Sequence, residues 1–470
     1  MISRKFTCSV AFTFALLPFD VIGNYAEAQT SATDSVSDIF ARENRNQLVM
    51  DIEAAIAQAQ AKYDIIPQRA ADQIAAHAGI QYAPLAAIKT EYKLTNHRMV
   101  ALLNVWRRSL DPGAANYLHY GVTTVDIYDT VRVLQIRASL NVLLADMVEI
   151  EDRLIVIATT HRDTVMVGRT IGQHALPITF GKKVVVWLAQ NRRNIDRLQE
   201  LQIRLESSGV LKGAVGTHLG LGPKGVLVER EVSAKLGLRT PEAADWHGAR
   251  DVFAEYGQVL ALISKSYASI GAEIFRLSTT DIGELSERQA TSNVGSSTMP
   301  HKKNPRWPER VIHHGRKIPR LAEVLLDDVE NSFERDNTSG PNRIIEEISL
   351  EAAKMMRDTK SLLKNLRVDK DRMRENLART DGMIMAQRLM LALSKHIDRT
   401  LAEEHVRKAA QKAIDTKMSF RAALLEDPVL APYLNDTIDE LLNPETYLGL
   451  AREQVDLSVA DIKRRRAQPK

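Results

Sequence analysis

One stretch of this sequence, from Asp126 to Thr164, constrains the fold more than any other. It contains 39 residues without a glycine or a proline. Apolar side chains recur in it at steps of three and four, as at Ile127, Val131 and Leu134, which is the spacing of one face of an α-helix. At 1.5 Å per residue such a helix would be roughly 58 Å long.

The same stretch is apolar on a second face, which carries Val133, Ile136 and Leu143. A helix that is apolar on several faces is stable only when other helices surround it. We therefore expect a bundle of long helices, of the kind that is often shared between subunits.

Further helical patterns follow along the chain, and no alternating apolar pattern of useful length predicts a strand. The expected fold class is therefore all-α, with a minor strand content. Long helices are expected at residues 181–208, 249–285, 309–331 and 344–366. The pattern divides the chain into an N-terminal helical domain (29–120), a central helical bundle (121–366) and a C-terminal helical domain (367–470).

The first 28 residues have the composition of an export signal. A basic start, MISRK, precedes a short apolar run from Cys8 to Phe19, and a small-residue cleavage site follows at Ala26 and Ala28. The alternatives are a buried N-terminal segment and a wrongly assigned start codon. We expect a signal peptide (1–28), cleaved near Ala28, and a periplasmic mature protein. That protein would lack the only cysteine, Cys8, and with it disulfides and thiolate metal ligands.

Composition and charge favour an ordinary globular protein. Of the 470 residues, 44% are apolar and 26% are charged, and the net charge is +4. The one block of like charge is the terminal KRRRAQPK, which we interpret as a solvated end and not as a nucleic-acid contact. No later run reaches the roughly 20 apolar residues of a membrane-spanning helix. Metal-ligand and nucleotide-binding motifs are also missing, so we expect no metal, no cofactor, no nucleic acid and no membrane contact of the mature form.

A polar loop, HYGVTTVDIYDT (119–130), lies directly before the longest expected helix. Thr123, Thr124 and Asp126 stand where they could cap that helix. Capping requires neither His119 nor both threonines. Because a helix N-terminus also offers free amides to a carboxylate, we interpret this loop as a candidate substrate site.

Two more loops carry polar side chains between expected helices. GRTIGQHALPITFG (168–181) has Gln173 and His174 before a proline, and we expect it to be a loop that leads into a long helix. GSSTMPHKKNP (295–305) has two serines after a glycine, followed by Lys302 and Asn304. Such donors hold carboxylates.

Together these loops resemble the signature regions of the fumarase/aspartase superfamily. GSSTMPHKKNP is similar to its defining GSSxMPxKxNP loop, and HYGVTTVDIYDT to its HxGxTSxDxxDT region. GAVGT (213–217) and WHGARDVFAE (246–255) resemble segments that flank the later central helices. FERDNTSGPNR (333–343) and LLNPETYLGLAREQVD (441–456) are similar to segments of adenylosuccinate lyases.

Two branches of the superfamily fit different parts of the chain. Residues 39–67 and 173–181 look most like 3-carboxy-cis,cis-muconate cycloisomerases, whereas residues 334–343 and the C-terminal domain look like adenylosuccinate lyases. The resemblance implies an adenylosuccinate-lyase-like enzyme that cleaves a C–N (or C–O) bond of a small succinyl or N-substituted aspartate-like polycarboxylate by β-elimination and releases fumarate or an analogue. The alternatives are a lactone-forming cycloisomerase and an inactive binding protein on the lyase scaffold. It also implies a three-domain fumarase-like fold and a homotetramer whose active sites combine loops of three subunits, without a cofactor.

The resemblance assigns roles to single residues. Ser296 would be the base that removes a proton from the carbon next to a carboxylate. Lys302, Asn304 and the amides near Thr123 and Thr124 would stabilise the resulting aci-carboxylate. Further substrate contacts are implied for His97, Asp126, Gln173, Ser297, Met299, Arg335 and Arg343, with the two arginines at the distal part of the substrate.

The proton donor to the leaving group is not given by the motif. Adenylosuccinate lyases carry a histidine directly after the threonine of the second loop, where this chain has Ile171. An isoleucine cannot transfer a proton, and cycloisomerases also lack that histidine. The histidines that could donate instead are His119, which we rank first, His174 and His97.

Overall fold

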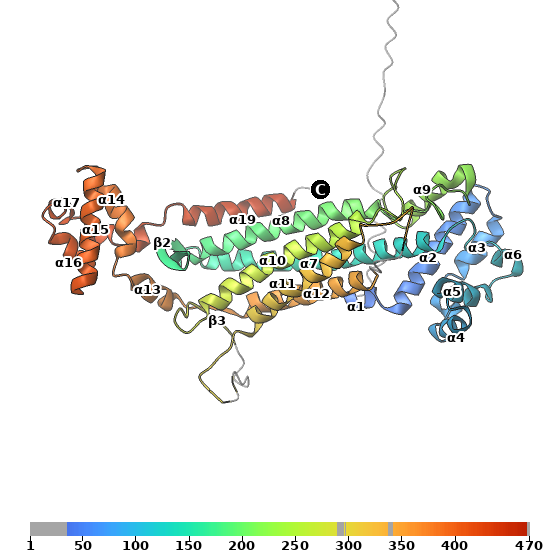
Figure 1. Cartoon of the computed structure of the whole chain (residues 1–470), viewed down its shortest axis with the longest axis horizontal. Helices are drawn as coiled ribbons and strands as arrows, with labels where there is room; N and C mark the ends of the chain where they lie inside the picture. The colour runs from blue at the N-terminus through green and yellow to red at the C-terminus, as the bar shows by residue number, and fades with distance from the viewer. Residues whose placement is uncertain (1–34, 289–295, 297, 337–341, 468–470) are drawn as a thin grey trace, which may run out of the picture.

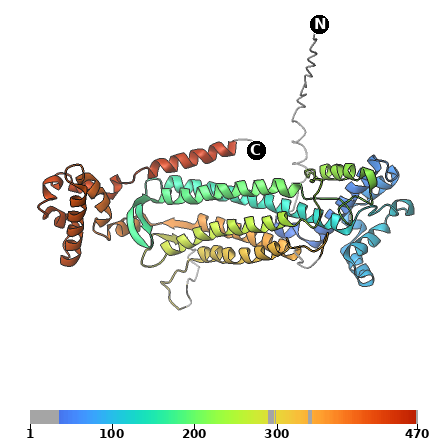
Figure 2. The same cartoon turned by 45° about the horizontal axis from the view of Figure 1, so that its top comes forward.

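The computed structural model describes residues 35–288, 296, 298–336 and 342–467. The expected signal peptide, with Cys8, lies outside these ranges. Five long helices run side by side through the centre of the molecule (Figures 1 and 2), and the expected all-α bundle is confirmed. They are α7 (Thr124–Thr160), α8 (Phe180–Glu206), α10 (Asp251–Leu277), α11 (Arg306–Asp327) and α12 (Asn342–Asn365).

Helix α7 forms the axis of the bundle core. Leu143, Met147, Ile150 and Leu154 follow one another at steps of three and four, and none has exposed surface. Burying a side chain of this size stabilises a fold by roughly 1.5–3 kcal/mol. Helices α8 and α12 pack along α7, so its apolar faces are covered as the sequence predicts.

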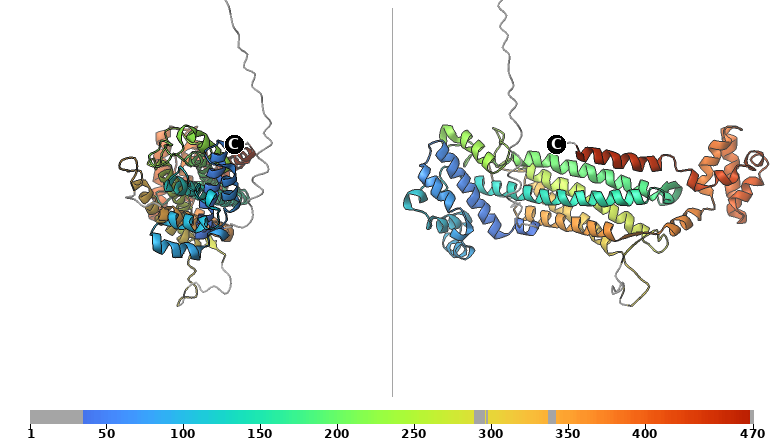
Figure 3. Two further views of the ribbon diagram at one scale, coloured as in Figure 1. Left: turned by 90° about the vertical axis from the view of Figure 1, so that its right-hand side faces the viewer. Right: turned by 180° about the vertical axis from the view of Figure 1, so that it is seen from behind.

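Smaller helices gather at the two ends of the bundle (Figures 1 and 3). At the end where α7 begins lie α1 (Val36–Ile39), α2 (Arg42–Lys62), α3 (Gln68–Ala76), η1 (Ile80–Tyr82), α4 (Leu85–Thr95), α5 (Arg98–Arg107), α6 (Pro112–Ala115), η2 (Gly222–Lys224) and α9 (Gly225–Lys235). At the other end lie α13 (Lys370–Ala378), η3 (Met383–Met385), α14 (Ala386–Leu393), α15 (Arg399–Thr416), α16 (Phe420–Leu425), α17 (Ala431–Leu434), α18 (Ile438–Leu441) and η4 (Pro444–Thr446). Helices α14 to α18 enclose a separate apolar core.

The last helix, α19 (Ala451–Ala467), returns along α8 toward the middle of the bundle (Figure 1). Arg466 pairs with the buried Glu151 and with Asp152, and Arg465 pairs with Asp196. The interpretation of the basic C-terminus as a solvated end is therefore wrong for these residues. Their charges are matched by carboxylates on α7 and α8.

The segment expected as the second polar loop is a β-hairpin. Strands β1 (Val165–Thr170) and β2 (Gln173–Thr179) pair antiparallel, with Thr170 opposite Gln173. Ile171 and Gly172 form the two-residue turn, at φ +51° and +77°, which is the left-handed backbone of a type I′ hairpin turn. Helix α7 also ends at Thr160, before the hairpin, and does not continue to Thr164.

A second short sheet lies at the same end of the bundle, where β3 (Leu285–Glu287) pairs antiparallel with β4 (Leu366–Val368). Strand β3 and helix α11 flank the segment that contains GSSTMPHKKNP. In the described part of the chain, no helix combines the length and the apolar content needed to cross a membrane.

Candidate active site

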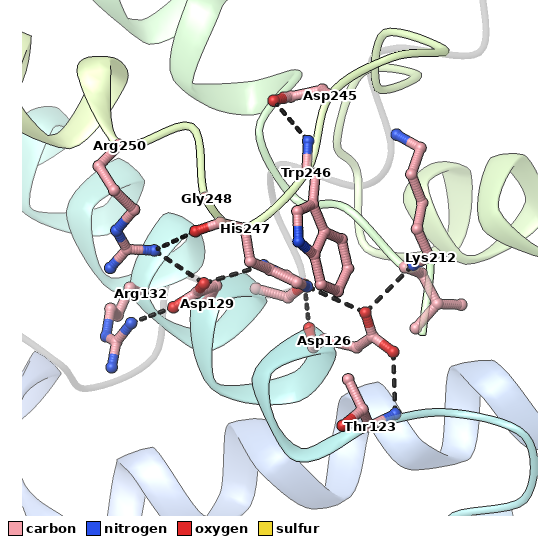
Figure 4. Close-up of polar contacts among 12 residues, drawn as sticks. Thr123, Asp126, Asp129, Arg132, Lys212, Asp245, Trp246, His247, Gly248 and Arg250 are labelled. Atoms are coloured by element: carbon pink, nitrogen blue, oxygen red, sulfur yellow. Dashed lines mark hydrogen bonds and ion pairs between the residues drawn. The ribbon is translucent and has the colours of Figure 1, made fainter. Parts of the chain in front are cut away.

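Polar contacts gather around the N-terminus of α7 (Figure 4). Thr123 is its N-cap residue, and Asp126 Oδ2 accepts a hydrogen bond of 2.9 Å from the Thr123 amide. Asp126 also accepts bonds from the amides of Lys212 and Gly213, each at 3.1 Å. The predicted capping role of Thr123 and Asp126 is confirmed. Asp126 joins the start of α7, where Thr124 is the first helical residue, to the 212–213 loop.

His247, which the sequence analysis did not select, completes this cluster. Its Nε2 lies 2.9 Å from Asp126 Oδ1 and its Nδ1 lies 2.9 Å from Asp129 Oδ2. The residue is only 3% exposed. Burial by itself would lower the pKa of His247, but the hydrogen bonds and charges of Asp126 and Asp129 raise it overall. His247 therefore favours the imidazolium form.

Arginines satisfy the remaining acceptors of the cluster. Arg250 donates to Asp129 Oδ2 at 2.8 Å and to Asp328 Oδ2 at 2.9 Å, and Arg132 pairs with Asp129. Burial would raise the pKa of Asp129, but Arg132, His247 and Arg250 hold it well below its usual range. These contacts fix the start of α7, the start of α10 and the end of α11 against one another.

His119 has a buried carboxylate partner. Its Nδ1 lies 2.5 Å from Oε1 of Glu53 on α2, and Glu53 is buried. Burial would lower the pKa of His119, but the hydrogen bond to Glu53 and the charges of Glu53 and Asp126 raise it. His119 also adopts φ +64°, uncommon for a residue with a side chain. A half-buried histidine whose pKa is raised keeps its proton to higher pH, which suits a proton donor.

A cavity of about 580 Å³ opens between α2, α4, α5 and α7 and the start of α12. Tyr128 and Gln135 on α7 line it, one to three turns beyond Thr124. Glu346 is the one carboxylate among the described lining residues. The basic residues that line it are Arg42, Arg45, Lys89, Arg98, Arg132 and Arg343.

The positive charges of this cavity repel one another. Burial lowers the pKa of Arg45, and the charges of Arg98 and Arg42 lower it further. An anion in the cavity would relieve this repulsion, since guanidinium groups bind carboxylates and phosphates with paired hydrogen bonds. Arg343, which the resemblance places at the distal part of the substrate, lines this cavity, where its Nε lies 2.9 Å from Glu347.

Two other predicted contacts lie near this end of α7. His97 is the N-cap of α5, and its Nδ1 accepts the Val100 amide at 3.3 Å. A capping role therefore accounts for His97. Arg335 is half-buried, and its charge acts on Arg132.

The hairpin residues Gln173 and His174 lie at the opposite end of the bundle from His119 (Figure 1). Ile171 at the tip is fully exposed. Burial and the charge of Arg169 lower the pKa of His174, which opposes its use as an acid. Within one chain, His174 and His119 are not brought together.

The predicted base lies in the segment between β3 and α11, also away from the start of α7 (Figure 1). Ser296 Oγ accepts a bond of 3.1 Å from the Met299 amide, and Ser297 lies outside the described residues. Met299, Lys302 and Asn304 are exposed.

Glu287 ties together the two ends of the segment between β3 and α11. Its carboxylate accepts the amides of Arg306 at 2.9 Å and Trp307 at 2.7 Å. It thereby joins the strand before the segment to the first turn of the helix after it.

Comparisons with known proteins identify the family. The sequence model of the family described as Lyase matches residues 27–319, and that of the adenylosuccinate lyase C-terminus matches residues 382–457. The chain belongs to the fumarate lyase family. The chain is 35% identical to the adenylosuccinate lyase of Methanocaldococcus jannaschii, over 92% of this chain and 95% of that protein.

Two other relatives are named for different reactions. The N-acetyl-S-(2-succino)cysteine lyase of Dickeya dadantii is 33% identical, over 94% of this chain and 96% of that protein. The solved 3-carboxy-cis,cis-muconate lactonizing enzyme of Pseudomonas putida is 31% identical, with a TM-score of 0.84, and covers 92% of this chain and 97% of that one. The protein is therefore an enzyme of the fumarate lyase type, and both predicted branches are present among its relatives.

Among the residues that the structure describes, no group of three or more His, Cys, Asp or Glu side chains could hold a metal ion.

Proposed function

We propose that this enzyme releases fumarate from a succinyl compound whose leaving group is itself anionic. The observation that carries the proposal is the basic cavity beside the start of α7. The N-terminal amides of α7 suit a carboxylate of the succinyl part. The arginines around Arg45 suit negative charge on the part that leaves.

The reaction proceeds by two proton transfers. Ser296, as its alkoxide, takes the proton from the carbon next to one carboxylate, and the electron pair is held as an aci-carboxylate by Lys302 and Asn304. That pair then forms the new C=C bond while the bond from the neighbouring carbon to nitrogen, oxygen or sulfur breaks. His119 gives its proton to the departing atom, so the products are fumarate and the leaving group protonated at that atom.

We further propose that the enzyme is a homotetramer whose active sites combine three chains. Support comes from the separation of the start of α7, the hairpin tip and the Ser296 segment within one chain. Apolar side chains also remain exposed on the long helices, among them Val148 and Val156 on α7, Val186 on α8 and Leu262 on α10. Partner subunits would cover them.

A second candidate function is lactone-forming cycloisomerisation. The observation in its favour is Ile171, which stands at the exposed hairpin tip in place of a proton donor. Intramolecular addition of a carboxylate to a double bond releases no leaving group, so it needs no residue at the hairpin tip to protonate one. The likeness to the lactonizing enzyme of P. putida supports the same candidate.

The test is a panel of substrates given to the purified protein. It contains adenylosuccinate, argininosuccinate, 3-carboxymuconate and N-substituted aspartates whose substituents carry no, one or two carboxylates. We expect fumarate, measured by its ultraviolet absorbance, to form fastest from the aspartates with carboxylated substituents. Consumption of carboxymuconate without any fumarate from the others would replace the proposal by the second candidate.

Export is proposed from the first 28 residues and needs its own measurement. Mass spectrometry of the protein purified from its native host should find an N-terminus close to Ala28. A mature chain that begins at Met1 would contradict export.

A further inference from the structure

We infer that His247 is a positioning residue that holds the N-terminus of α7 in its working geometry by bridging Asp126 and Asp129. This inference rests on the proposed function for its link to turnover. His247 itself touches neither the proposed base nor the basic cavity in the described contacts. It acts through Asp126.

Both ring nitrogens of His247 face carboxylate oxygens, each at 2.9 Å. A neutral imidazole has one N–H donor and one acceptor, whereas the imidazolium has two donors. Only the imidazolium can therefore donate to both Asp126 and Asp129. A neutral ring would turn an unprotonated nitrogen toward one of the two buried carboxylates, which is unfavourable at this distance.

Asp126 is the residue through which His247 reaches the site. Its two oxygens accept the amides of Thr123, Lys212 and Gly213 as well as His247 Nε2. Rotation of this one carboxylate would loosen the cap of α7 and the 212–213 loop together. The amides proposed to bind the substrate carboxylate belong to that same first turn.

The charged groups around His247 determine which protonation state of its ring is favourable. Asp126 and Asp129 on α7 face its ring, and Arg132, Arg250 and Asp328 complete the contacts of Asp129 and Arg250. Asp126, Asp129 and Asp328 thus bring three carboxylates into direct contact with two guanidinium groups and the His247 ring, which favours a positive charge on that ring. Lys212 lies on the other side of Asp126, but its Nζ is engaged by the Glu242 carbonyl at 2.7 Å and by Glu229 at 3.5 Å.

Two more groups border the cluster. The ring of Trp246 stands edge-on to that of His247, with centroids 4.5 Å apart, and Trp246 Nε1 donates to the Glu334 carbonyl at 3.0 Å. The charge of Arg335 acts on Arg132. Trp246 thus joins the loop that carries His247 to the segment that carries Arg335.

The direction of the pH effect follows from these contacts. The pKa of His247 is raised in the folded protein above its ordinary value. Its stabilisation of the cluster is then complete below the unfolded-state pKa and is lost as the pH rises through the folded-state pKa. We expect turnover to fall on the alkaline side for the same reason.

The test compares two substitutions that keep different halves of the bridge. His247→Gln places an amide donor at the position of Nε2, toward Asp126, and His247→Asn places one at the position of Nδ1, toward Asp129. We expect kcat to fall about tenfold in H247Q and about 100-fold in H247N, since misplaced catalytic geometry of this kind costs up to two orders of magnitude. In both variants, the fall of kcat at alkaline pH that is due to His247 should disappear, because neither amide titrates.

His405→Gln is the matched control. His405 forms a comparable pair with Asp427, at 2.9 Å, in the separate core at the other end of the molecule. H405Q should keep the kcat, the KM and the pH profile of the parent. Parent-like kcat and an unchanged fall of kcat at alkaline pH in both His247 variants would overturn the inference.

A measurement without substrate separates this inference from the proposed function. The melting temperatures of the parent and H247N are compared between pH 5 and 10, a range that spans the ordinary pKa of histidine. The advantage of the parent should shrink as the pH rises. A difference that does not change with pH would overturn the inference, whereas absence of fumarate release by the parent would count against the proposed function alone.

Discussion

The two ends of the helical bundle hold their functional residues in different ways. At the end where α7 begins, Asp126, Asp129 and His247 are buried and each has several charged or amide partners. At the end where α7 stops, Ile171 at the hairpin tip and Lys302 beside α11 are exposed. In the mechanism proposed above, the buried end binds the substrate and carries His119, and the other end presents the Ser296 segment outward.

Two histidines show the same contrast. At the start of α7, the buried Glu53 raises the pKa of His119, whereas burial and Arg169 lower that of His174 in the hairpin. A donor must hold its proton at the working pH, so the comparison favours His119. The following substitutions test this division between the two ends, from the largest expected effect to the smallest.

Ser296→Ala at the exposed end should cause the largest loss. We expect fumarate release to fall about 10³-fold, because removal of a general base costs between two and four orders of magnitude. Substrate binding, measured by calorimetry, should change little. Thr298→Ala, an exposed neighbour in the same segment, serves as the control and should stay active. An S296A variant that turns over normally would remove Ser296 from the mechanism.

His119→Asn should come next, with a loss of about 10²-fold in kcat, while His174→Asn should lose less than tenfold. If His119 is the acid, turnover falls as the pH rises through its raised pKa. Glu53→Gln removes the carboxylate that raises this pKa, so the fall should move to lower pH. A larger loss in H174N than in H119N would reverse the assignment.

Arg45→Met should have an intermediate effect that depends on the substrate. The KM for aspartates with carboxylated substituents should rise about tenfold, equal to roughly 1.4 kcal/mol, while that for neutral substituents should not change. Lys93→Met is the matched control, because Lys93 is an exposed cation on α4 that does not line the cavity. Equal changes of KM for both substrate types would show that the cavity does not bind the leaving group.

Arg466→Ala should have the smallest effect, and on stability alone. Its ion pairs with Glu151 and Asp152 fasten α19 to α7, but Arg192 also pairs with Glu151. We expect the free energy of unfolding to fall by about 1 kcal/mol, measured by denaturant titration. Arg464→Ala, whose pair with Asp461 lies within α19, should change it less. The opposite order would indicate that α19 is held by its apolar face alone.

Local patterns in the sequence predicted the long helices and the N-cap of α7. Thr123 and Asp126 are three residues apart, so their relation can be read from the chain itself. His247 and Glu53 were missed because their partners, Asp126 and His119, lie 121 and 66 residues away. Only the packing of separate helices brings such pairs together.

The hairpin was missed for a different reason. Gly168 and Pro177 interrupt the alternation of apolar side chains in β1 and β2. The apolar residues from Val165 to Val167 also continue the pattern of the helix before them. The separation of the three loops within one chain could not be read from motifs either, because motif spacing says nothing about which subunit completes a site.

Mixing two inactive variants tests the central claim most directly. S296A and H119N are co-expressed with different tags, and hybrid tetramers are isolated and confirmed by native mass spectrometry. If each site takes Ser296 and His119 from different subunits, random assembly restores about a quarter of the sites, and fumarate release should recover accordingly. Hybrids as inactive as the two parents would place both residues in one chain's site and contradict the account.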